Sequence, residues 1–301
     1  MLIGLAETAL GRVALERGTL AVARRWLREA VLHLQACDPR QVLVSALAML
    51  ARAEATAGAV GQAREIRARA ETVRSTRPTH WFNRVDLART DATIAAVAGD
   101  LQQARAIARE AATASGEDRL SEALLLHESL RFGEPPAALA ARLTEVASVV
   151  DGDLTGAFAA HTTALRAGKG EALDIVAETL AGMGSLLSAA EAYAHAAAAH
   201  RARGNTMSPN KSAARSSRLA TACGGPQTPA LPTAAAPVVR LSEREQQVAS
   251  LAAKGLSNRA IAEALQLSTR TVESYLYRAS VKIGASGRRE LVDIQQPPQP
   301  R

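Results

Sequence analysis

Towards the C-terminal end of the chain, polar residues recur at helical spacing and would share one face of a helix. This face carries Arg270, Glu273, Ser274, Tyr277 and Arg278. Guanidinium groups bind phosphates and the edge of guanine, and a carboxylate accepts a hydrogen bond from the amino group of cytosine. Hydroxyl groups can reach base edges or phosphates. The pattern therefore indicates contacts with DNA.

The opposite face of this segment is apolar, and its residues stand four, three and four positions apart. Its members are Val272, Leu276, Ala279 and Ile283. This spacing predicts a helix over about 269–283, with Ser268 or Thr269 as its N-cap and Gly284 at its end. A short turn at Gln266 precedes the helix. The apolar face would hold the helix on its neighbours and leave the polar face in solvent.

Two shorter helices are predicted upstream and one downstream. Ser242 and Glu245 have the spacing of a capping box, and Gly255 suits the end of the helix that they begin. Ser257 is a fitting N-cap for the next helix. A last helix is expected over about 288–294, because prolines follow it. Four short helices with a tight turn before the third indicate a helix-turn-helix, which places one helix in the major groove of DNA.

This segment resembles the DNA-binding domain of LuxR/FixJ-type bacterial transcription factors. The matching residues are Leu241, Arg244, Glu245, Val248, Gly255, Leu256, Ser257, Asn258, Ile261, Ala262, Leu265, Leu267, Ser268, Thr271, Val272, Glu273, Leu276, Lys282, Gly284 and Arg288. The sequence departs from the usual pattern at Tyr275, where histidine is common, and at Glu273, where lysine is a frequent alternative. Both departures bear on which DNA sequence is read.

The helical period and the resemblance together predict the residues that contact DNA. These are Ser257, Asn258, Arg259, Ser268, Thr269, Arg270, Thr271, Glu273, Ser274, Tyr277, Arg278 and Lys282. Phosphate contacts position a protein on the duplex and base contacts specify the sequence, and we expect Glu273, Ser274 and Tyr277 to contact bases. One such module buries little surface, which favours a homodimer on double-stranded DNA. By resemblance, Leu291 and Val292 are candidate dimer contacts.

Residues 1–203 contain a repeated pattern in which a glycine is followed five positions later by an alanine. The glycines are Gly18, Gly58, Gly99, Gly133 and Gly184, and Gly168 fits with its alanine one position earlier. A glycine that ends one helix, followed by a small residue that allows close packing of the next, predicts stacked helical hairpins. The pattern resembles a degenerate tetratricopeptide-like array, and a generic helical bundle is the alternative.

Composition favours an all-α chain. Apolar residues make up 48% of the sequence and aromatic residues only 3%, so Ala, Leu and Val must build the cores. We expect a helical repeat array over 1–203, a flexible basic linker over 204–237, a four-helix helix-turn-helix domain over 238–296 and a disordered tail over 297–301. The linker is rich in Pro, Gly and Ser, which disfavours a packed core. The excess of the net charge of +7 lies in the linker and the last domain, where a polyanion would bind.

The sequence shows no motif of an enzyme or of a cofactor or metal site. It lacks a Gly-x-x-x-x-Gly-Lys-Ser/Thr loop, and Cys37 and Cys223 have no partner motif. Glu191 and His195, four positions apart, are interpreted as a surface contact. No apolar run is long enough to span a bilayer, and no signal peptide is evident. We therefore expect a cytoplasmic protein without enzymatic activity, cofactor or membrane contact.

Helical repeats before a LuxR-type domain resemble the C-terminal part of the large ATP-binding LuxR-family regulators. Those regulators have an upstream ATPase module that this sequence lacks, so a shortened member or part of a longer product is expected. The helix-like start at Met1 favours the second. The resemblance implies a transcription regulator, with RNA polymerase and a protein or small-molecule effector of the array as further candidate partners. The alternative is an interaction scaffold with weak or lost DNA binding, because Glu273 would repel phosphates.

Overall fold

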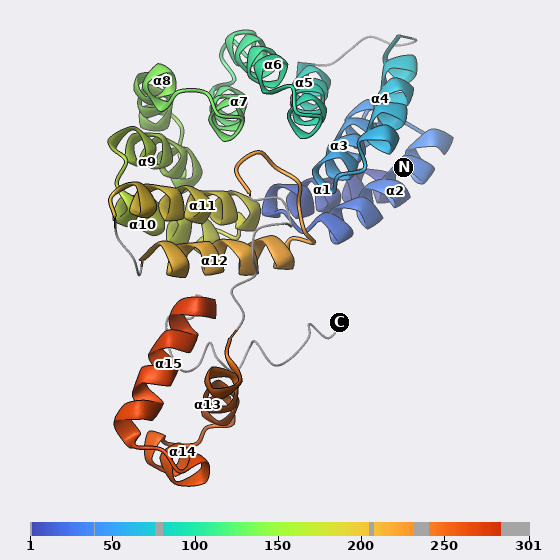
Figure 1. The fold of residues 1–301 in the computed structure, drawn as a ribbon. Coiled ribbons are helices and arrows are strands. Elements are labelled where there is room, and N and C mark those ends of the chain that lie inside the picture. The colour runs from blue at the N-terminus through green and yellow to red at the C-terminus, as the bar shows by residue number, and fades with distance from the viewer. Residues whose placement is uncertain (1, 39, 76–80, 205–207, 232–240, 284–301) are drawn as a thin grey trace.

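The computed structural model describes residues 2–38, 40–75, 81–204, 208–231 and 241–283 (Figure 1). Every regular element in these ranges is an α-helix, which confirms the predicted all-α fold. Alanine and leucine, which dominate the composition, are among the strongest helix formers. Within the described ranges, no helix combines the length and the apolar character that crossing a bilayer requires.

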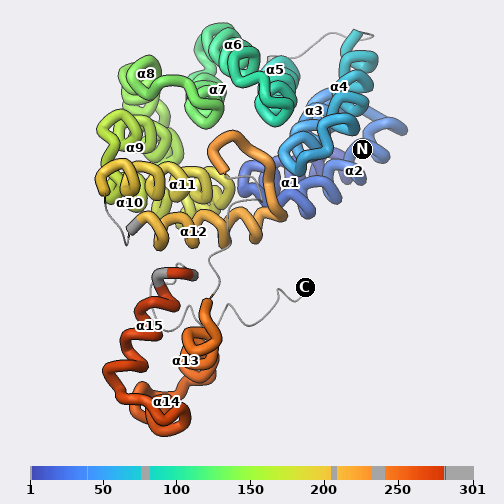
Figure 2. The backbone as a smooth tube through the Cα atoms, in the orientation of Figure 1, coloured from blue at the N-terminus to red at the C-terminus, as the bar shows by residue number. Residues whose placement is uncertain are grey.

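The first twelve helices form six consecutive hairpins, and the predicted glycines lie at the turns of the first five (Figure 2). The pairs are α1 (Leu2–Arg17) with α2 (Leu20–Ala36), α3 (Leu43–Thr56) with α4 (Val60–Ser75), α5 (Trp81–Val97) with α6 (Leu101–Thr113), α7 (Arg119–Arg131) with α8 (Pro136–Val149), α9 (Asp153–Ala167) with α10 (Gly170–Gly182), and α11 (Leu186–Ala202) with α12 (Ser208–Ala222).

The glycine and the alanine of the repeat both act as predicted in the first three hairpins. Gly18 and Gly58 have φ values of 84° and 89°, a conformation that glycine adopts without strain. The following alanines are fully buried in four units, at Ala23, Ala63, Ala104 and Ala189. In the Gly133 unit the alanine at 138 is exposed, and Leu139 is buried instead. This shift follows from the start of α8 at Pro136, which sets a different register for the helix.

The structure changes the assignment of the last repeat. Gly184 lies between α10 and α11, which belong to neighbouring hairpins, whereas Gly204 lies between the two helices of the sixth hairpin. Gly204 has a positive φ of 72°, like the other hairpin glycines. Five positions later the chain has Pro209, which is buried. A search for glycine followed by alanine therefore missed this unit.

The six hairpins close into a ring (Figures 1 and 2). Helix α1 of the first hairpin packs against α11 of the last. The approach is close, because a Cβ atom added to Gly18 would lie 2.7 Å from the Cβ atom of Leu187. The first helix of a hairpin is generally the more buried one: every residue of α3 is buried, whereas α4 buries only Ala63, Ile66 and Ala70. The sequence predicted stacking but not closure.

Most of the predicted flexible linker, 204–237, is folded. Helix α12 occupies residues 208–222 and packs along α11. The Ser216 hydroxyl donates a hydrogen bond to the carbonyl oxygen of Ala190, at 2.7 Å. Composition was misleading here because the polar side chains of this helix bond to the array, so the segment packs without a large apolar face.

Residues 223–231, here called the strap, continue from α12 back across the ring. The backbone N–H of Gln227 donates to the carbonyl oxygen of Thr56, at 2.7 Å. Leu231, at the end of the strap, is buried with Leu187 and Cys223. The strap therefore joins the sixth hairpin to α3. The remainder of the predicted linker, 232–240, lies outside the described residues.

The C-terminal domain contains three described helices: α13 (Glu243–Ala253), α14 (Asn258–Leu265) and α15 (Thr269–Ile283). Its core consists of Val248, Ala252, Ile261, Ala262 and Val272. The predicted helix over 288–294, the candidate dimer contacts Leu291 and Val292, and the tail over 297–301 lie outside the described residues. The C-terminal end of α15 lies beside α12, and α14 lies at the end remote from the ring (Figure 1).

Candidate nucleic-acid interface

The first helix of the C-terminal domain begins with the predicted capping box. The backbone N–H of Glu245 donates to the Ser242 hydroxyl at 3.3 Å, and the backbone N–H of Ser242 donates to the Glu245 carboxylate at 2.7 Å. Gly255, with a φ of 86°, follows the end of this helix, as predicted. These local signals fix where α13 starts and stops.

The turn between α14 and α15 sets the direction of the candidate recognition helix. Ser257 caps α14 by accepting a hydrogen bond from the N–H of Ala260, at 3.2 Å. Gln266 ends this helix in the left-handed conformation, with a φ of 54°. Ser268 accepts from the N–H of Thr271 at 3.1 Å, so Ser268 caps α15. The predicted turn and caps are thus present, and they resolve the choice between Ser268 and Thr269.

Helix α15 has the two predicted faces. Val272 and Ala279 are completely buried, and Leu276 is half-buried against the core. The residues of the polar face, Arg270, Glu273, Ser274, Tyr277 and Arg278, are all exposed. Tyr277 is 59% exposed, which is unusual for a large aromatic side chain and suits a residue that contacts a partner.

The other predicted DNA-contacting residues lie around the start of α14 and α15. The exposed ones are Ser257, Arg259, Ser268 and Thr269, and the half-buried ones are Asn258, Thr271 and Lys282. The structure thus brings the N-terminal ends of both helices and the polar face of α15 to the surface. Whether each of these residues contacts DNA remains a prediction.

Several cations of this surface interact within the domain. The Arg278 guanidinium lies 4.7 Å from the ring centroid of Tyr275, and Arg259 pairs with Glu263 at 3.1 Å. Both members of the second pair are largely exposed, at 86% and 69%. Exposed pairs of this kind contribute little to stability, so they can exchange for a phosphate. Tyr275, the departure from the usual family residue, thus positions Arg278.

Lys282 has a partner that sequence reasoning missed. Its ammonium group donates to the carboxylate of Glu245 at 2.7 Å. Burial alone would raise the pKa of Glu245, but the hydrogen bonds from Lys282 and Ser242 lower it below the usual value. Lys282 therefore neutralises a buried carboxylate, which competes with its predicted phosphate contact. No local pattern could show this, because the two residues lie on different helices and far apart in sequence.

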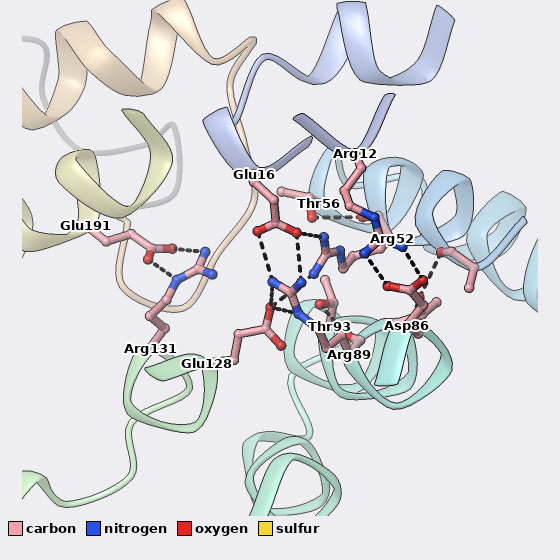
Figure 3. Close-up of polar contacts among 12 residues, drawn as sticks. Arg12, Glu16, Arg52, Thr56, Asp86, Arg89, Thr93, Glu128, Arg131 and Glu191 are labelled. Atoms are coloured by element: carbon pink, nitrogen blue, oxygen red, sulfur yellow. Dashed lines mark hydrogen bonds and ion pairs between the residues drawn. The ribbon is translucent and has the colours of Figure 1, made fainter. Parts of the chain in front are cut away.

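Within the ring, the interpretation of Glu191 and His195 as a surface contact is wrong. Glu191 is completely buried and accepts two hydrogen bonds from the Arg131 guanidinium (Figure 3). His195 instead lies 3.1 Å from the ring nitrogen of His161, which in turn lies 3.1 Å from that of His127. The three histidines follow each other at the repeat spacing of 34 residues, a periodic signal that was available in the sequence.

Burial keeps these histidines uncharged. It lowers the pKa of His161 to about 3, with a further lowering by His195 and Arg131. It likewise lowers the pKa of His127 well below its usual value, and it lowers the pKa of His195. The ring interior therefore contains a row of neutral imidazoles beside the buried ion pair of Arg131 and Glu191.

Comparison with known proteins bears on the C-terminal domain. Residues 239–295 match the family of bacterial regulatory proteins, luxR family. No curated protein and no solved structure gives a significant match to the chain. The matched residues span the capping box, the helix-turn-helix and the polar face of α15. The chain therefore carries a LuxR-family helix-turn-helix domain after a large all-helical region.

Proposed function

We propose that the chain is a sequence-specific transcription regulator whose α15 enters the major groove of DNA. The observation that carries this proposal is the exposed polar face of α15 in a domain that matches the luxR family. The buried Val272, with the half-buried Leu276, holds the opposite face on the core formed with α13 and α14. A helix held in this way can insert its exposed side chains without disturbing the core.

The roles within the interface follow from position. Arg270 is exposed in the first turn of α15, where the helix dipole also favours a phosphate. Glu273, Ser274 and Tyr277 lie further along the same face, within reach of base edges. Since one helix-turn-helix reads a short half-site, we infer that the chain binds as a dimer to a two-fold site.

The test is a selection of random duplex DNA on the full-length chain, followed by sequencing of the bound molecules. A recovered motif with two-fold symmetry is the expected result, and it would give the operator. In binding assays on that motif, Arg270→Ala should reduce the salt dependence of binding, because a phosphate contact releases counterions. Ser274→Ala should change the preferred sequence more than the affinity.

The second candidate function is a protein-interaction scaffold with weak or lost DNA binding. The observation in its favour is that three of the predicted DNA-contacting cations, Arg259, Arg278 and Lys282, already interact within the domain. The same selection separates the two functions. A folded chain that enriches no sequence would support the scaffold and overturn the regulator.

A further inference from the structure

An open cavity of about 700 Å³ lies at the inner side of the ring. Its wall is formed by inner helices from α1 to α11 and by strap residues Gln227, Thr228 and Pro229. Its apolar lining includes Leu15, Val97, Leu120, Leu124, Phe158 and Leu187. This volume lies within the range of small-molecule sites, which are about 300–1,000 Å³ and mainly apolar with a few polar groups.

Two carboxylates and two guanidinium groups meet at the wall of this cavity (Figure 3). Arg89 binds Glu16 at 2.8 Å and Glu128 at 2.7 Å, and Arg52 binds the same two carboxylates at 2.5 and 3.2 Å. Burial would raise the pKa of Glu16, but Arg52 and Arg89 lower it well below the usual range. The four charges therefore balance, and both arginines are engaged.

Glu128 has one oxygen that this cluster does not use. All three contacts with the arginines go to Oε1, whereas Oε2 is buried without a hydrogen-bond partner among the described residues. Glu128 is only 3% exposed and lines the cavity. The Thr228 hydroxyl of the strap, which also lines the cavity, is buried and unpartnered as well. An unsatisfied buried polar group is unfavourable, and a ligand with a matching group would remove this cost.

The charges around Glu128 select the group that a ligand presents there. An anionic group would meet Glu128 while Arg52 and Arg89 are occupied, and a cationic one would leave a net charge in the buried cluster. An uncharged hydroxyl or amide N–H group can donate to Oε2 of Glu128 without changing the net charge of the cluster. The remaining wall combines apolar residues with Arg17, Asp118 and Asp153, and the His127 ring, stacked on Phe158 at 3.8 Å, adds a flat surface.

We propose that this cavity binds an uncharged, mainly apolar small molecule whose hydroxyl or amide N–H group donates to Glu128. The ligand also touches Gln227, Thr228 and Pro229, which lie a few residues before the segment that leads to the C-terminal domain. The strap is held at Thr56 and by the burial of Leu231, so a ligand that contacts the strap adds to the interactions that fix its position. The ligand thereby acts as an effector of DNA binding, and this last step alone rests on the proposed function.

The test uses the full-length chain and a series of medium-chain alcohols and primary amides, with carboxylates and amines of the same carbon skeletons. Binding is measured by calorimetry and by the shift of the unfolding temperature. The alcohols and amides should bind and raise this temperature, and the ions should not. Equal binding of charged and uncharged probes, or no binding by any of them, would overturn the proposal.

Two variants locate the site, with one matched control. Leu120→Trp fills the cavity from a position outside the charged cluster and should abolish probe binding. Leu10→Trp makes the same change at a residue that is equally exposed, at 47%, but does not line the cavity, and should leave binding unchanged. Glu128→Gln should weaken binding of the alcohols about tenfold or more, because a hydrogen bond to a charged group is lost. Equal binding by the two tryptophan variants would show that the probes bind elsewhere.

A DNA-binding assay with and without the best probe separates the two proposals. If the probe changed the DNA affinity of Leu10→Trp but not that of Leu120→Trp, the result would establish that ligand binding in the cavity is coupled to DNA binding. Probe binding without any effect on DNA affinity would keep the ligand site and reject its regulatory role. Failure of the chain to bind any DNA would reject the proposed function, and the calorimetric result would still decide the ligand site.

Discussion

The ring and the C-terminal domain differ in the burial and pairing of their arginines. In the ring, Arg52 and Arg89 are at most 5% exposed, and each binds two carboxylates. In the C-terminal domain, Arg270 and Arg278 are exposed on α15. Buried ion pairs determine which helices pack together, whereas exposed charges can bind a partner. The difference shows that the basic character of a segment does not by itself identify a polyanion-binding surface.

The largest expected effect comes from breaking the buried cluster. Arg89→Ala leaves Glu16 and Glu128 with one arginine between them, and removing one partner of a buried pair costs about 3–5 kcal/mol. Urea unfolding followed by tryptophan fluorescence measures this change, because both tryptophans, Trp26 and Trp81, lie in the ring. Arg74→Ala, which breaks an exposed pair with Glu71, is the control and should change the midpoint very little. Similar losses in the two variants would remove the distinction between buried and exposed charge.

The second prediction concerns the row of histidines. The folded pKa of His161 is about 3, below the value of about 6.5 in an unfolded chain. The unfolded chain therefore binds a proton first, and stability falls below about pH 6.5, by about 1.4 kcal/mol per pH unit for this residue. His161→Gln should make the pH dependence of the urea midpoint shallower in the mildly acidic range.

If His161→Gln retained the acid sensitivity of the parent chain, the neutral buried row would not be the source of the effect.

The third prediction concerns the exposed charges. Arg270→Ala should weaken binding to the selected DNA about tenfold, since single contacts to phosphates or bases contribute about 1–3 kcal/mol. Its unfolding midpoint should stay that of the parent chain, because the side chain is exposed. Arg64→Ala, at an exposed position on α4, is the control for nonspecific charge. Equal losses of DNA affinity in both variants would point to a general electrostatic effect.

The smallest expected effect comes from Lys282, which belongs neither to the buried charges nor to the fully exposed ones. Lys282→Met should destabilise α13 and α15 by about 1 kcal/mol, because the carboxylate of Glu245 loses a partly buried partner. Since the folded pKa of Glu245 is lowered, the contribution is present above pH 4.5 and is lost as the pH falls further. Hydrogen exchange of peptides from the C-terminal domain measures the change. If this variant showed unchanged hydrogen exchange but bound DNA much more weakly, the result would support the predicted phosphate contact of Lys282.

The sequence predicted most of the C-terminal domain because its signals are local. The capping box at Ser242, the turn at Gln266 and the apolar stripe through Val272 each depend on residues a few positions apart. The pairing of Lys282 with Glu245 depends on tertiary packing, so only the structure shows it. The predicted dimer contacts lie after Ile283, outside the described residues, and stay a prediction.

The ring was predicted only in part for the same reason. Glycines that end helices can be recognised in the sequence, and their spacing predicted helical hairpins. The closure at Gly18 and the cluster around Glu128 bring together residues from distant repeats. The folded α12 was missed because serine and arginine suggest a linker unless their bonding partners on α10 and α11 are known.

The contact between Gly18 and Leu187 also limits how this protein can change its length during evolution. An open solenoid can gain or lose a hairpin at either end, since each unit contacts only its neighbours. In a closed ring, a hairpin added or deleted between α1 and α11 would separate these two helices, and one added or deleted between α7 and α11 would also move Arg131 away from Glu191. We therefore expect homologous chains with this closure to keep six hairpins and to vary in their loops.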